Sequence, residues 1–166
     1  MNGNSAEFLE ALRLIRQFFP EAKATLQSHI GVDFYAFLQA MQYTSLQQDS
    51  SCNVFRHSIE SVGQWANLGG FSGTNVEIYT RLLAYTGFKP HGRVVVVPDA
   101  LSIRSVSLDH CPPFICLAQT LPMRLSEASS NVTFGSSHRD TLLVYESGEA
   151  IAIDHDDRLF WTKSKT

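Results

Sequence analysis

Long apolar runs are absent from this sequence. No stretch approaches the about 20 consecutive apolar residues that a helix needs to cross a bilayer, so we expect no membrane-spanning segment and no membrane partner. Glu7, Glu10 and Arg13 interrupt the apolar residues near the N-terminus, which argues against a secretory signal there. The two absences together predict a cytoplasmic protein.

Cysteine is scarce, with Cys52, Cys111 and Cys116 as its three occurrences. An odd number of cysteines in a chain without a secretory signal indicates reduced thiols. Asp109 and His110 precede Cys111, so side chains that bind metals stand close together here. A zinc site takes four ligands, often as two closely spaced pairs, and no second pair is present. We therefore predict no metal site and no cofactor.

Basic residues are outnumbered by acidic ones. The chain has 13 Lys and Arg against 16 Asp and Glu, and its formal net charge is −3. Binding to nucleic acid depends on a basic surface that displaces counterions from the phosphates. We expect no nucleic-acid partner.

The chain does contain enough apolar sequence for one domain. Of its 166 residues, 44% are hydrophobic and 17% are charged, a composition typical of globular proteins. Apolar side chains recur at helical spacing up to Gly87 and at strand spacing after Pro90. We predict one domain over residues 1–166 with an α+β fold, in which a helical part (4–87) packs on a mainly antiparallel sheet (93–163).

The best helix signals surround residues 74–87. Thr74 and Glu77 have the spacing of a capping box, and Gly87 suits a left-handed C-terminal cap. Another helix is expected at about 5–19. A helical region follows Pro20, is broken near Gly31 and restarts with Asp33 as its cap, and residues 42–51 form its frayed end and a loop. A further helix is expected at 54–66.

Strand formers follow in short runs separated by turn residues. Strands are expected at 93–97, 101–108, 114–119 and 131–134, and as a three-stranded meander over 141–161. Apolar periodicity also predicts the core. Its expected members are Leu12, Ile15, Phe37, Phe55, Ile59, Leu82, Val95, Ile115, Val144 and Ile151.

Acidic residues are concentrated in the meander. Between Asp140 and Asp157 there are six acids and no Lys or Arg. Because most of them fall at strand ends and turns, we expect them to be exposed, either as solvated surface or as a patch for a basic partner. Trp161 follows them, and an exposed aromatic residue beside acids is typical of a binding hot spot. The predicted partner-binding residues are Asp140, Glu146, Glu149, Asp154, Asp156, Asp157 and Trp161.

The meander has a characteristic order of elements: a strand, Ser147-Gly148-Glu149, AIAID, an acidic turn and LFW. This order resembles the closing strands of small bacterial toxin-immunity proteins, over the terminal stretch of the chain only. The resemblance implies a stoichiometric inhibitor. Our prediction is a protein-binding module, an immunity protein or inhibitor that occludes a toxin or enzyme partner with a basic site.

Two other classes of function stay open. A small enzyme would need Cys52 or Cys111 beside a histidine base, and no nucleophile signature surrounds either cysteine. A small-ligand sensor would need a pocket between the helices and the sheet. We expect no catalytic residues.

Overall fold

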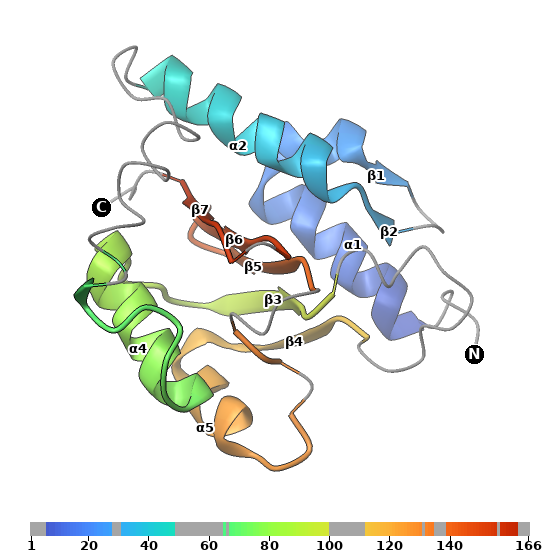
Figure 1. The fold of residues 1–166 in the computed structure, drawn as a ribbon. Helices are drawn as coiled ribbons and strands as arrows, with labels where there is room; N and C mark the ends of the chain where they lie inside the picture. The colour runs from blue at the N-terminus through green and yellow to red at the C-terminus, as the bar shows by residue number, and fades with distance from the viewer. Residues whose placement is uncertain are drawn as a thin grey trace.

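The computed structural model of the chain describes residues 6–27, 31–48, 65, 67–99, 112–130, 132–134, 139–155 and 157–162. Within these residues the chain forms three layers, with an antiparallel sheet between helices (Figure 1). Helices α1 (Ala6–Phe18) and α2 (Phe34–Gln48) cover one face, and α4 (Asn75–Thr86) and α5 (Leu121–Ser126) cover the other. The predicted α+β fold is confirmed.

The sheet has five strands in the order β4-β3-β5-β6-β7, and every neighbouring pair is antiparallel. Its strands are β3 (Arg93–Val97), β4 (Phe114–Leu117), β5 (Thr141–Tyr145), β6 (Ala150–Ile153) and β7 (Leu159–Trp161). The last three form the predicted meander. Strand β3 is an interior strand next to the edge strand β4, because Val95 pairs with Ile115 of β4 on one side and with Val144 of β5 on the other.

Alternate residues of these strands point to opposite faces and supply two separate cores. One core joins α1 and α2 to side chains such as Val95 and Val144. The other joins α4 and α5 to Val94, Leu143 and Ile151. Seven of the predicted core residues are buried: Leu12, Ile15, Phe37, Leu82, Val95, Val144 and Ile151. Ile115 is only half-buried, and Phe55 and Ile59 lie outside the described residues.

Helix α4 has the predicted ends. The Glu77 main-chain N–H donates to Thr74 Oγ1 at 3.2 Å, and the Thr74 N–H donates to Glu77 Oε2 at 2.7 Å, which completes the capping box. Gly87 ends the helix at φ 76°, where a side chain would be strained. In the core beneath α4, the hydroxyl oxygens of Tyr79 and Tyr145 are 2.9 Å apart, and burial raises the pKa of Tyr79 to about 12.

The region after Pro20 differs from the prediction in two ways. Pro20 begins a 3-10 helix, η1 (Pro20–Thr25), and the break near Gly31 is a short hairpin of β1 (Leu26–Gln27) and β2 (Gly31–Val32). Asp33 then caps α2 as expected, since its Oδ1 accepts from the Ala36 N–H at 3.1 Å. Helix α2 continues to Gln48, so most of the polar stretch predicted as a frayed end and loop is helical.

The strand predicted at 114–119 is shorter than expected. It ends at Leu117, and a 3-10 turn, η3 (Ala118–Thr120), leads into α5, a helix that is absent from the sequence-based prediction. Pro122 explains the switch, because proline cannot donate to a strand ladder but fits the first turn of a helix. Residues 132–134 form no strand. The predicted strand at 101–108 and nearly all of the predicted helix at 54–66 lie outside the described residues.

Candidate functional site

The acids of the meander lie at two opposite ends of the sheet. Asp140, Asp154 and Asp157 are at the end where β5 begins and β6 turns into β7, whereas Glu146 and Glu149 are at the turn from β5 to β6. A strand of five residues, the length of β5, separates its ends by roughly 15 Å. These acids therefore form two separate groups, one at each end of the meander.

Asp140 and Asp154 are buried, so the expectation that they are exposed is wrong for both. Asp140 Oδ1 accepts the main-chain N–H of His155 at 2.9 Å and lies 3.1 Å from its Nδ1. Asp154 Oδ1 and Oδ2 accept the N–H and Nε–H of Arg158 at 2.9 and 2.7 Å. These hydrogen bonds tie both carboxylates to the β6–β7 turn. Asp140 Oδ2 is buried and has no hydrogen-bond partner among the described residues.

At the other end of the sheet, Glu149 is buried and its expected exposure is also wrong. Its Oε2 is 3.3 Å from the Ser147 hydroxyl, which donates to it. Glu146 is exposed but is bound to Arg93, whose main-chain N–H and Nη2 donate to it at 2.7 and 2.9 Å. These hydrogen bonds from the Arg93 side chain and main chain lower the pKa of Glu146 to about 2.

The remaining predicted binding residues are only partly accessible. Trp161 is half-buried, and its ring packs edge-on against Tyr85 at a centroid distance of 5.5 Å. Asp157 is half-buried with a left-handed backbone, φ 60°. Asp156 lies outside the described residues. A role in partner binding for this set stays a prediction, and the structure supplies a different candidate site.

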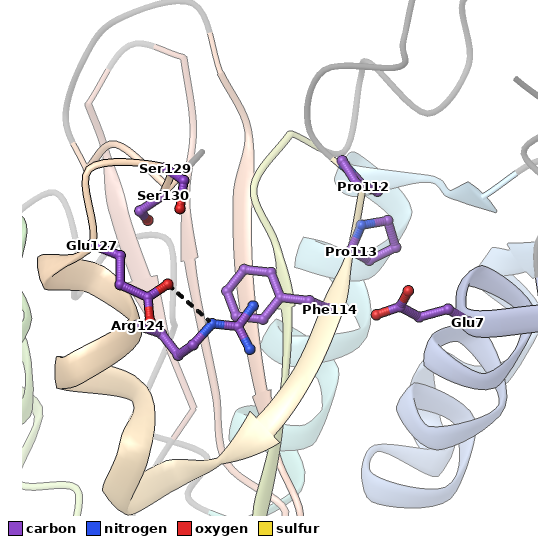
Figure 2. A pocket seen from close by; sticks show the side chains of 8 residues that line it. All are labelled: Glu7, Pro112, Pro113, Phe114, Arg124, Glu127, Ser129 and Ser130. Carbon is purple, nitrogen blue, oxygen red and sulfur yellow. Dashed lines mark ion pairs between the residues drawn. The ribbon is translucent and has the colours of Figure 1, made fainter.

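That candidate is a pocket beside the edge strand β4, between the start of α1 and the end of α5 (Figure 2). It has a volume of about 220 Å³. We call it the edge pocket. Its lining residues are Glu7, Pro112, Pro113, Phe114, Arg124, Glu127, Ser129 and Ser130.

Two carboxylates and one guanidinium determine the charge of the edge pocket. The Arg124 guanidinium lies over the Phe114 ring, 4.5 Å from its centroid, and its Nε is 3.9 Å from Glu127 Oε2. Glu7 extends from α1 on the other side of β4 (Figure 2), and its carboxylate has no hydrogen-bond or ion-pair partner among the described residues. The pocket therefore has one carboxylate more than it has cations.

Strand β4 differs from the rest of the sheet in its exposure. Phe114, Ile115 and Cys116 are half-buried and Leu117 is 47% exposed, whereas every residue of β5 and β6 is buried. No strand among the described residues pairs with the outer edge of β4. The edge pocket thus adjoins a strand edge whose apolar side chains are accessible.

Cysteine chemistry finds no support at Cys116. Burial raises the pKa of its thiol, although Arg124 and Thr120 act in the opposite direction. A thiol with a raised pKa is mostly protonated at neutral pH and is a poor nucleophile. Cys52, His110 and Cys111 lie outside the described residues. Among the residues that are described, no group of three or more His, Cys, Asp or Glu side chains is placed to hold a metal ion.

Comparison with known proteins identifies no relative. No protein-family model matches the chain, and no match was found among curated proteins or solved structures. Within the described part of the chain, no helix is long and apolar enough to cross a membrane.

Proposed function

We propose that this chain is a cytoplasmic protein-binding module, an immunity protein or inhibitor. It captures a partner protein by binding to a basic site on that partner. The observation that carries the proposal is the edge pocket, where the carboxylates of Glu7 and Glu127 lie beside an exposed strand edge and Glu7 has no partner among the described residues. An excess of carboxylates at such a place favours a cationic group, and it repels an acidic one.

The size of the edge pocket favours a protein partner over a small ligand. Pockets for small molecules have volumes of about 300–1,000 Å³, and this one has about 220 Å³. A single side chain of a partner fits this space. The lining supports a Lys or Arg side chain in particular, because Phe114 and the two prolines can contact its apolar stem while the carboxylates bind its charged end.

The test is charge reversal in the edge pocket. A partner captured by the wild-type chain from its host would be purified, and its binding kinetics compared for Glu7→Lys, Glu127→Lys and the double variant at low and moderate salt. We expect the double variant to bind about tenfold more weakly and with less dependence on salt.

Glu21→Lys is the matched control for each single variant, because Glu21 is exposed in η1, outside the edge pocket, and its reversal changes the net charge by the same amount as either single reversal. Wild-type kinetics in the double variant, or an equal loss in the control, would contradict the proposal.

A further inference from the structure

The hydrogen-bond pattern of β4 shows which of its main-chain groups face outward. The Ala118 N–H donates to the Gly92 carbonyl at 2.8 Å, so these two residues form a hydrogen-bonded pair. In antiparallel strands such pairs alternate with non-bonded pairs. The pair of Cys116 and Val94 lies two positions along the strands from the pair of Ala118 and Gly92, so Cys116 is also hydrogen-bonded to β3. Ile115 and Leu117 therefore direct their N–H and C=O groups away from β3.

Among the described residues, three main-chain groups on the outer edge of β4 have no hydrogen-bond partner. The Leu117 carbonyl accepts a hydrogen bond from the Thr120 hydroxyl at 2.9 Å. The three groups that remain available for pairing are the Ile115 N–H, the Ile115 C=O and the Leu117 N–H. No described strand pairs with them. Pro112 and Pro113 precede this short edge, where the missing proline N–H groups limit how far pairing can extend.

Edge strands are usually protected by charged side chains, by prolines within the strand or by a covering element. Strand β4 has the sequence FICL, so it contains no charged residue and no proline, and its Leu117 is 47% exposed. At the opposite edge of the sheet, β7 is only three residues long and Trp161 packs against Tyr85. Of the two edges of the described five-stranded sheet, the edge at β4 is thus the one with accessible apolar side chains.

We infer that a partner adds an extended strand to the outer edge of β4 and places a Lys or Arg side chain in the edge pocket. This inference rests on the proposed function and specifies its binding mode. Phe114 connects the two features, because its backbone belongs to the strand and its ring lines the pocket. Main-chain bonds then supply affinity, and the pocket selects the side chain.

Charge complementarity favours such a partner over a second copy of this chain. Two copies pairing through β4 would bring residues 112–117, PPFICL, to each other's edge, and this segment contains no Lys or Arg. The edge pocket would then gain no cation to match Glu7 and Glu127.

The test uses capped synthetic peptides of about eight residues, a usual strand length, built from alternating Val and Thr with one central Arg. Three matched peptides complete the set: one with Glu in place of Arg, one with Gln, and one with Arg whose main-chain N–H groups are methylated along one edge. Binding is measured by fluorescence anisotropy, and protection of the Ile115 and Leu117 amides by hydrogen exchange.

We expect the Arg peptide to bind about tenfold more tightly than the Gln peptide and to bind more tightly still than the Glu peptide. Methylation should weaken binding at least as much, because it removes main-chain donors and leaves the charge unchanged. The bound Arg peptide should slow exchange at Ile115 and Leu117. The variants Glu7→Gln and Glu127→Gln should reduce the preference for Arg over Gln.

Leu117→Pro sharpens the test within the protein itself. The backbone of Leu117 has φ −74°, which proline adopts, and its N–H points outward, so the change removes one edge donor without breaking the ladder to β3. We expect a normal fold by circular dichroism and weaker peptide binding. Leu117→Ala, which keeps the N–H, is the control and should bind nearly as wild type.

The other outcomes separate the two proposals. Arg-dependent binding that methylation leaves unchanged would overturn strand addition and leave the proposed function intact. Binding that needs the peptide N–H groups but ignores Arg, Gln and Glu would overturn the edge pocket as the selective site. Protection of Ile115 that rises with protein concentration alone would make a second copy the occupant, and binding of none of the peptides would overturn the inference.

Discussion

Strands β4 and β5 lie on either side of strand β3, yet they differ completely in exposure. Every residue of β5 is buried, whereas no residue of β4 is. Their sequences, FICL and TLLVY, are both apolar, so composition does not distinguish them. The difference comes from their neighbours, because β5 pairs with β6 while no described strand pairs with the far side of β4. Among the described residues, the outer edge of β4 is therefore open.

The largest expected effect comes from a matched pair of leucines. Leu143→Ala in β5 should lower the free energy of unfolding by about 2–5 kcal/mol, because it leaves a cavity in a fully buried site. Leu117→Ala in β4 should lower it by less than about 0.5 kcal/mol, since nearly half of that residue is exposed and it belongs to neither core cluster. Urea unfolding of both variants measures the difference. Equal losses would mean that β4 is as much a part of the core as β5.

A smaller effect is expected where β5 ends, at the ion pair between Glu146 and Arg93. The pKa of Glu146 is lowered to about 2, so the folded state holds this carboxylate ionised below the pH at which the unfolded chain protonates it. The resulting stability is present above the ordinary glutamate pKa of about 4.3 and is lost as the pH falls towards 2.

Glu146→Gln should therefore lose less stability than the wild type between about pH 5 and pH 2. Thermal unfolding of the two proteins across this range measures the contrast. Glu77→Gln is an informative comparison, because the pKa of Glu77 is also lowered, by the capping hydrogen bonds of Thr74 far from the sheet. If wild type and Glu146→Gln lose stability equally as the pH falls, the ion pair contributes no stability at the end of β5.

Much of the fold is predictable because local patterns and tertiary structure agree. The capping box at Thr74 and Glu77 and the three runs of strand formers in the meander each specify their element without reference to distant residues. Helix α5 was missed because the apolar run continues from β4, while Pro122 in fact marks a helix start. The polar stretch in α2 was misread as a frayed end, although Gln and Leu are good helix formers.

The candidate site was less predictable than the fold. The division of the acids between two ends follows from the hairpin order itself, since successive turns of a meander lie at opposite ends of the sheet. Burial of Asp140 was not evident, because its partner His155 is 15 residues away. The edge pocket brings together Glu7, Phe114 and Glu127 from three separate segments, and no local spacing relates them.

Amide hydrogen exchange in β4 of the free protein is the most direct test of this account. We expect the Ile115 and Leu117 amides to exchange much faster than the Cys116 amide between them, because only Cys116 donates to β3. Fast exchange at alternate positions would show an open edge that is ready to pair with a partner strand. Equal protection of all three amides would show that the edge is already covered, and would contradict the proposal that a partner binds there.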